Sequence, residues 1–465
     1  TMQQEYKSRG GLVMWLAVLV LPTLAHAGAK DQERTSRISD DAAPLIDLDQ
    51  FPQRPKPILE LGNPFLGTGN IAPGIELPGG AVWQPSVLVF GTYRSAVQAF
   101  HDGDETASEW ANRLDLFANL QLSGTERALF GARPLDEEGH FTGMVFDPNA
   151  TNESGFEDEY NFEITTLFFE GDLGELIPDA DPYDTKSLDL GFAVGRQPLF
   201  FQEGLLINDD IDAIGITRNT LLPTGGTDLQ LLFIYGWNDI HRDDNIENED
   251  LHLFGFFVTG DFPVNTINAD FVYVHNEDED TDGAYWGVSS VQRIGHFNAS
   301  IRALGSHALD VESDAVSSGY LLFGEVSWTP AWTHDNVYVN AFCGIDQFAS
   351  AARGPATGGP LGRTGILFAA VGIGQYGAAL GNRADESVGA AIGYQIFIDD
   401  IRKQVIFELG GRQSTDAEGD GLVALGARYQ QAIGQHMVLQ LDAFASHQES
   451  RDAGWGSRVE IRYEF

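Results

Sequence analysis

The sequence predicts an all-β fold, a transmembrane antiparallel β-barrel of about 18 strands, with about 16 to 20 as the range. Three observations predict it. Apolar and polar residues alternate with a period of two along many short segments after Ala81, which is typical of strands with two different environments. The connections between these segments are alternately short and long. The only long apolar run, residues 12–21, is too short for a membrane-spanning helix.

The alternation is clearest in three internal segments and at the end of the chain. In RLDLFANLQLSG, HMVLQLDAFAS and DLQLLFIYGW, apolar residues recur at every second position. In the final GSRVEIRYEF, one parity holds Val459, Ile461, Tyr463 and Phe465, and the other holds Arg458, Glu460, Arg462 and Glu464. In a barrel the first face contacts lipid and the second a wet lumen. Candidate strands begin near residues 81, 109, 125, 159, 186, 211, 227, 250, 265, 283, 296, 318, 335, 386, 402, 421, 436 and 456.

The connections support a barrel independently of the strands. After even-numbered strands they are mostly tight, as in SGT, PTGG and IGH, with the connection near residues 173–185 as the longest exception. After odd-numbered strands they are longer and acidic, as in HRDDNIENED and NEDEDTDG. Outer-membrane barrels have short periplasmic turns and long extracellular loops. We therefore expect both termini in the periplasm and an even number of strands.

The N-terminal region divides into two expected parts. Residues 1–27 combine basic Lys7 and Arg9, a short apolar run and an A-x-A site, a pattern typical of a cleaved secretory signal peptide. Residues 28–80 are polar and contain several prolines without periodicity, and we expect an extended periplasmic arm. Residues 81–465 then form the barrel, which the chain is expected to close by pairing its last strand with its first.

Composition and motifs exclude several functions. The chain has 27 Lys and Arg against 68 Asp and Glu, a net charge of −41, which would repel nucleic acid. A single cysteine, Cys343, excludes an intramolecular disulfide and a cysteine-pair metal site. No G-x-S-x-G, H-E-x-x-H or Walker motif is present. We expect no cofactor and no enzymatic activity, with a barrel enzyme as the minor alternative.

Two segments resemble known families. The C-terminal strand resembles those of outer-membrane barrels, which implies recognition by the barrel-assembly machinery through Phe465. Residues 188–219, LDLGFAVGRQPLFFQEGLLINDDIDAIGITRN, resemble the alginate-export family of porins; the matching positions are Gly195, Arg196, Gln197, Asp212 and Arg218. This resemblance implies a monomeric barrel that passes a solute through a narrow, charged lumen. Because basic residues are scarce here, we do not carry over alginate as the solute.

The lumen should be lined by the charged parity of several strands. A charge facing lipid at the midplane costs about 2–4 kcal/mol for Arg or Lys, so such residues should point inward. Arg196 has the parity of its apolar neighbours, which a bulge or a position near the rim would reconcile. These charges select a solute or simply pair with one another in a ladder. The candidates are Arg113, Asp115, Arg196, Gln197, Asp212, Arg218, Glu408, Arg412, Arg458, Glu460, Arg462 and Glu464.

An acidic loop and a long connection raise separate questions. Asp278, Asp280 and Asp282 precede Gly283 as in an EF-hand loop, but the twelfth position is Ser289 rather than Glu. A solvated acidic loop is therefore preferred over a calcium site. Residues 349–385 are long and apolar in their middle, and connections of this length are usually functional or disordered. We expect an inward constriction or plug, with an extra hairpin as the alternative.

These features together predict a channel of the Gram-negative outer membrane for small hydrophilic or charged solutes. The expected partners are membrane lipid, lipopolysaccharide and the solute. The excess of carboxylates predicts a weak cation preference, unless the few arginines gather at the constriction. A barrel that encloses a partner protein as a sheath or scaffold is the other alternative.

Overall fold

We analysed a computed structural model of the chain, which describes residues 55–62, 73–147, 154–181, 183, 187–399, 401–416 and 419–465. The chain divides into two units, Thr1–Gln53 and Arg54–Phe465, and the described residues belong to the second. The predicted signal peptide, residues 1–27, and most of the predicted arm lie outside the described residues. In the part that is described, no helix is long and apolar enough to cross a membrane.

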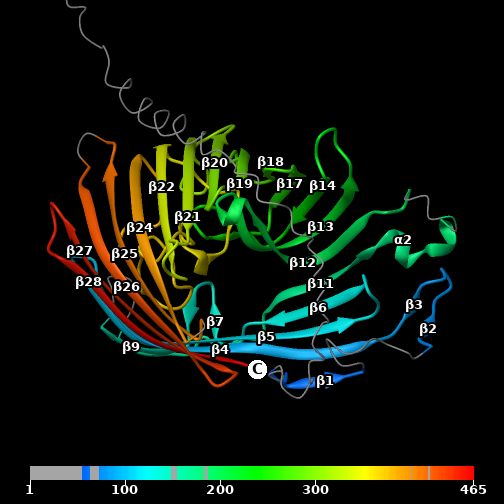
Figure 1. Ribbon diagram of the computed structural model, residues 1–465, viewed down its shortest axis with the longest axis horizontal. Helices are drawn as coiled ribbons and strands as arrows, with labels where there is room; N and C mark the ends of the chain where they lie inside the picture. Colours follow the sequence, from blue (N-terminus) through cyan, green and yellow to red (C-terminus); the bar gives the residue numbers. More distant parts are fainter. Residues whose placement is uncertain are drawn as a thin grey trace, which may run out of the picture. The chain divides into compact units, whose positions relative to one another are not determined.

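The second unit is a closed barrel of 18 antiparallel strands among the described residues, and the predicted fold class is confirmed (Figure 1). Each strand pairs with its neighbours in sequence, and the last strand, β28, closes the ring on β4. The strands are β4 (Ser86–His101), β5 (Thr106–Gln121), β6 (Arg127–Ala132), β11 (Ile164–Asp172), β12 (Gly191–Phe201), β13 (Ile207–Leu221), β14 (Asp228–Trp237), β17 (Leu251–Asp261), β18 (Asn265–Asn276), β19 (Gly283–Ile294), β20 (Phe297–Ala308), β21 (Gly319–Trp328), β22 (Asn336–Asp346), β24 (Ser387–Ile398), β25 (Lys403–Ser414), β26 (Gly421–Ile433), β27 (Met437–Gln448) and β28 (Gly454–Glu464).

The smaller elements lie in the connections and at the N-terminal side. A four-residue helix, α2 (Leu173–Leu176), begins the long connection after β11, and the side chain of Asp172 caps its first N–H groups. Strand β6 pairs with residues 116–121 of β5, and β9 pairs with residues 108–111 of the same strand. Together, β6 and β9 therefore occupy the third strand position of the barrel. The others are β1 (Leu59–Leu61), β2 (Ile75–Glu76), β3 (Val82–Trp83), β7 (Asp136–Glu137), β8 (His140–Phe141), β9 (Gly143–Asp147), β10 (Gly155–Glu157), η2 (Pro178–Ala180), η3 (Gln202–Gly204), β15 (Ile240–His241), β16 (Glu247–Asn248), β23 (Ala352–Arg353) and η4 (Pro355–Thr357).

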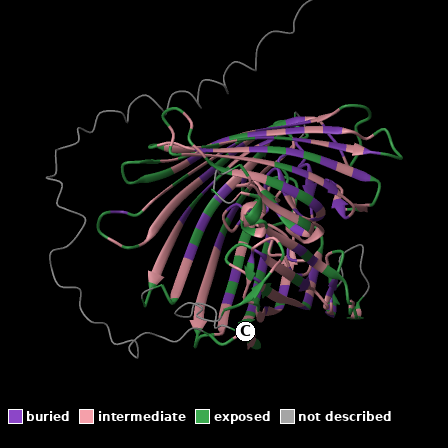
Figure 2. Cartoon of the chain, turned by 90° about the vertical axis from the view of Figure 1, so that its right-hand side faces the viewer, coloured by how far each residue is buried: buried purple, intermediate pink, exposed green. Residues whose placement is uncertain are grey.

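The alternation of the sequence separates an apolar outer face from a polar interior. In β28, Val459 and Ile461 are 50% and 46% exposed, whereas Arg458 and Glu460 are 2% and 3% exposed. Figure 2 shows the same banding along the other strands. An apolar outer band around a polar interior is the arrangement of transmembrane barrels. The outer face of the strands is therefore apolar, as contact with the hydrocarbon core of a bilayer requires.

The hairpin of β12 and β13 leaves the wall and turns inward. The β11 strand pairs with β12 only as far as Arg196, and β14 pairs with β13 only as far as Ala213. Beyond these points the two strands continue to pair with each other. At the tip, Phe201 stacks on Phe257 of β17, with ring centroids 3.6 Å apart. The inner hairpin, residues 196–212, thus lies against the interior face of β17, two positions from β13 in the strand order.

The inner segment, residues 348–386, also lies inside the barrel. Its backbone N–H groups at Ile366 and Leu367 donate to Glu408 of β25 over 3.0 and 2.9 Å. On β4 and β5, Arg94 donates to the Val371 carbonyl over 2.8 Å, and Arg113 to the Gly372 carbonyl over 3.0 Å. The segment is therefore held at both β25 and the β4–β5 wall.

The alternative of an extra wall hairpin is wrong. Strand β22 pairs directly with β24 from Asn336 to Cys343, so the wall has no place for further strands between them. Within the inner segment, the strand residues are the two of β23, which pair in parallel with β13. A third insertion, the inner loop of residues 133–142, meets this segment where Phe141 packs with Ile373.

Candidate functional site

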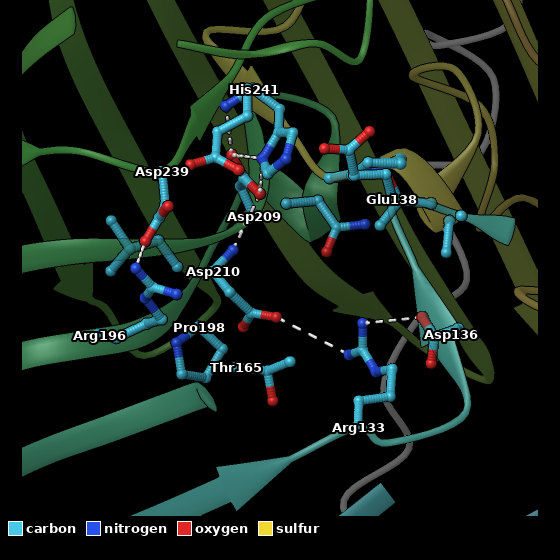
Figure 3. A pocket seen from close by; sticks show the side chains of 18 of the residues that line it. Arg133, Asp136, Glu138, Thr165, Arg196, Pro198, Asp209, Asp210, Asp239 and His241 are labelled. Carbon is cyan, nitrogen blue, oxygen red and sulfur yellow. Dashed lines mark hydrogen bonds and ion pairs between the residues drawn. The ribbon is translucent and has the colours of Figure 1, made fainter. Parts of the chain in front are cut away.

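A charged cavity of about 390 Å³ lies where the three inner elements meet (Figure 3). The inner loop, the inner hairpin and the inner segment each contribute to its lining, together with the loop after β14. Its volume is within the range of small-molecule sites. The charged or titratable lining residues are Arg113, Arg133, Asp136, Glu138, Glu163, Arg196, Asp209, Asp210, Asp239, His241, Glu247 and Arg363.

Arg133 joins the inner loop to the inner hairpin. Its guanidinium lies 3.0 Å from Asp115 of β5, 3.7 Å from Asp136 and 3.8 Å from Asp210. Because its side chain is largely buried, these contacts are less screened than surface ion pairs. The cationic charge of Arg133 is thus already shared among three carboxylates.

Arg196 makes a second junction, at the point where β12 leaves the wall. It pairs with Asp212 across the hairpin over 3.2 Å, with Glu163 over 3.8 Å and with Asp239 of the loop after β14. The register of β12 with both neighbours is continuous here, so the bulge that we considered does not form. The side chain of Arg196 has the parity of the outer face, but it contacts other segments of the chain rather than lipid, because β12 turns inward at this residue.

His241 and Asp209 form a third pair in the cavity wall. The ring Nδ1 lies 3.0 Å from Oδ1 of Asp209, and the backbone N–H of His241 donates to Oδ2 over 2.9 Å. Burial lowers the pKa of His241, but the hydrogen bond and charge of Asp209 outweigh it and raise the pKa above its usual value. The imidazole therefore stays protonated to a higher pH than a free histidine.

Asp136 binds a proton more readily than a free aspartate. Burial raises the pKa of this carboxyl to about 6, against the lowering effect of Arg133. Its Oδ1 atom is buried and has no hydrogen-bond partner within the described residues. An ionised carboxylate with an unsatisfied oxygen is costly to bury, so both observations favour partial protonation near neutral pH.

A ladder of ion pairs runs along the neighbouring part of the wall, from β4 to β26. Arg94 of β4 pairs with Glu460 of β28 over 2.8 Å, and Arg458 lies between Glu460 and Asp442 at 2.5 and 2.9 Å. Arg428 of β26 pairs with the same Asp442 over 2.5 Å. These carboxylates and arginines satisfy one another, as the ladder alternative described.

Most predicted lumen residues lie inside, in three groups. Arg113, Glu408 and Arg412 bind backbone groups of the inner segment. Gln197 is buried and donates to the Ala213 carbonyl over 3.2 Å. The remaining inner candidates belong to ion pairs: Asp115 with Arg113 and Arg133, Arg196 with Asp212, Arg458 with Glu460, and Arg462 with Glu464.

The assignment of Arg218 to the lumen is wrong. It shares the parity of Ile214 and Ile216, which are 39% and 46% exposed on the outer face of β13. Its guanidinium donates to the Asp189 carbonyl over 2.7 Å, in the connection before β12. From Ala213 onward, β13 is part of the barrel wall. The alternation of inner and outer faces therefore applies to this part, and it places Arg218 on the outer face.

The acidic loop shows no metal geometry. No group of three His, Cys, Asp or Glu residues able to hold a metal ion occurs in the parts of the chain that the structure covers. Asp282 instead accepts hydrogen bonds from Tyr273 over 2.5 Å and from the Asn276 N–H over 3.0 Å, and contacts His275 at 2.8 Å. Its oxygens are therefore used within the loop.

Sequence reasoning missed several cavity residues. Arg133, Asp210, Asp239, His241 and Arg363 come from different loops and from the inner hairpin. The run HRDD at 241–244 indicated an acidic loop but not that it faces the interior. A parity pattern cannot indicate contacts between insertions, because these have no regular period.

Comparisons with known proteins identify the fold. No protein-family model matches the chain, and no curated protein is similar to it in sequence. Among solved structures it is similar to a BenF-like porin from Pseudomonas fluorescens Pf-5, with a TM-score of 0.56 and 11% identity over 82% of this chain and 98% of that one. OccK2 (OpdF) from Pseudomonas aeruginosa gives 0.54 and 11%, over 82% and 97%. OccAB3 from Acinetobacter baumannii gives 0.53 and 10%, over 82% and 99%. The fold is that of outer-membrane porins.

Proposed function

We propose that the protein is an outer-membrane channel that lets small hydrophilic solutes cross through the charged cavity. The observation that carries the proposal is the combination of a closed barrel, apolar outside, with an interior narrowed by three inserted elements around a polar cavity of about 390 Å³. A narrow passage with fixed charges of both signs selects solutes by size and charge.

The alternatives have less support. A sheath around a partner protein needs an open lumen, whereas the inner segment here is bonded to both β25 and the β4–β5 wall. A barrel enzyme would need a nucleophile or a metal site. The His241–Asp209 pair has no serine or cysteine beside it among the described residues that line the cavity. These points favour a channel without enzymatic activity.

The finer assignments rest on the sequence. Kinship with the alginate-export family is supported by Gly195, Arg196, Gln197 and Asp212. Gly195 has φ +118°, and a Cβ there would lie 2.2 Å from the Leu167 carbonyl oxygen, so this position needs glycine. We also propose lipid, lipopolysaccharide and the assembly machinery that reads strands ending like Phe465 as partners.

Conductance of the purified full-length chain in a planar bilayer tests the proposal. We expect discrete current steps, and larger steps after deletion of residues 363–381, which removes the part of the inner segment that contains both docking points. A folded barrel that conducts neither before nor after this deletion would overturn the proposal. Heat-modifiable migration on gels verifies that both proteins are folded.

A further inference from the structure

Within the part of the chain that the structure describes, some charged residues that line the cavity have a partner of opposite charge, and others do not. Arg133 and Arg196 are paired with carboxylates, as are Arg113 with Asp115 and His241 with Asp209. Three charged lining residues have no ion pair among the described residues: Arg363, Glu138 and Glu247. These three residues are one cation and two anions that have no partner of opposite charge in that part of the chain.

Arg363 is held by an aromatic ring instead of an acid. Its guanidinium carbon lies 4.5 Å from the centre of the Phe200 ring, in the inner hairpin. The residue is exposed although it lies in the inner segment. Stacking on a ring fixes the plane of the guanidinium and leaves its N–H donors free. A carboxylate could accept two of these donors side by side.

Glu138 and Glu247 lie on the histidine side of the cavity. Both act electrostatically on His241, whose pKa they raise together with Asp209. Glu138 is exposed at the turn between β7 and β8, and Glu247 is half-buried in β16. An ionised carboxylate only accepts hydrogen bonds, so these two side chains attract an ammonium group and disfavour a second anion.

We propose that the cavity selects small dipolar solutes that carry both a carboxylate and an ammonium group, such as free amino acids. Arg363 binds the carboxylate, and Glu138 and Glu247 attract the ammonium. A simple anion is attracted by Arg363 but repelled by the two glutamates. A simple cation is attracted by the glutamates but repelled by Arg363. The inference rests on the proposed channel function and specifies the solute class of the same cavity.

Uptake by proteoliposomes containing the full-length chain tests this inference. Alanine, lactate and glycerol are probes of similar size that are zwitterionic, anionic and neutral. We expect alanine to enter several-fold faster than lactate or glycerol. Arg363→Gln should remove most of this advantage, and so should the double variant Glu138→Gln, Glu247→Gln. Arg218→Gln is the matched control, because it removes one positive charge from the outer face, and it should keep the preference.

Ion selectivity gives a second measurement on the same proteins. Under a salt gradient, Arg363→Gln should move the reversal potential toward cation selectivity, and the double glutamine variant toward anion selectivity. A conducting channel in which alanine has no advantage, or in which the two sets of variants leave the reversal potential unchanged, overturns the solute assignment alone. A chain without conductance overturns the channel itself, so the two failures are distinguishable.

Discussion

The wall pair β17–β18 and the inner hairpin of β12 and β13 are both regular antiparallel ladders, yet only the first remains in the barrel wall. Every residue of Leu251–Asp261 pairs with Asn276–Thr266, and both strands have further neighbours along their length. The hairpin keeps its internal register but loses both outside neighbours beyond Arg196 and Ala213. Alternation therefore defines two faces of a strand, and the neighbouring strands decide what each face meets.

Placing a charge on the wall should have the largest effect on stability. Leu425 is 57% exposed on the outer face of β26, and Leu425→Arg should destabilise the barrel by about 2–4 kcal/mol. Unfolding by urea in lipid vesicles measures this. The control is Leu222→Arg, at an exposed turn next to β13, where the cost should be about 0–1 kcal/mol. Equal costs at the two positions would show that the outer band does not meet lipid.

Loosening the inner segment should have the next largest effect. Glu408 is fully buried and accepts hydrogen bonds from the Ile366 and Leu367 N–H groups and from Tyr338. Glu408→Ala leaves buried donors unpaired, at a cost of about 1–3 kcal/mol. We expect larger and noisier current steps in a bilayer. Glu464→Gln, in an exposed pair with Arg462, is the control. Unchanged current in the alanine variant would mean that the segment does not narrow the path.

The inner loop should respond to pH. The folded pKa of Asp136, about 6, lies above its usual value of 3.8, so the folded state binds the proton more tightly than the unfolded state. The contribution of Asp136 to stability is therefore highest below pH 3.8 and falls as pH rises through 6. Asp136→Asn should raise stability at pH 7.5 by on the order of 3 kcal/mol and leave it unchanged at pH 3.5. Thermal unfolding in detergent at both pH values measures this, and equal shifts at both would contradict it.

Arg218 should give the smallest effect. It lies on the outer face near a short turn and donates to the Asp189 carbonyl. Arg218→Gln should change stability by no more than about 0.5 kcal/mol, as surface substitutions usually do, and should leave the single-channel conductance unchanged. A changed conductance would instead indicate that Arg218 faces the lumen, as the family resemblance implied.

The wall could be predicted from sequence because its code is local. Two environments, lipid and water, recur along every strand, so Val459 and Arg458 reveal their faces without knowledge of any partner. The expected strand starts and the strand number followed from this, and the alternately short and long connections supported them independently. The inward course of residues 349–385 was expected only because an apolar connection of that length has no favourable place outside.

The cavity could not be predicted because its contacts join insertions far apart in the chain. Arg196 meets Asp239, and Arg363 meets Phe200, although no spacing rule connects them. Arg196 was selected by a family resemblance rather than by physics, and its parity even argued against an interior position. Arg218, selected in the same way, lies outside. A sequence motif specifies residue types. Which of these residues lie together in the interior depends on the point at which β12 leaves the wall.

The ladder at Arg94 has a consequence for the order of assembly. This arginine comes from the first barrel strand, pairs with Glu460 of the last, and also binds the Val371 carbonyl of the inner segment. The docking surface for residues 371–373 is thus complete only after the two ends of the barrel have met. An open, half-built sheet lacks part of it. Docking of residues 371–373 is therefore completed only when the ring closes, after the strands that hold Glu408 and Arg113 have formed.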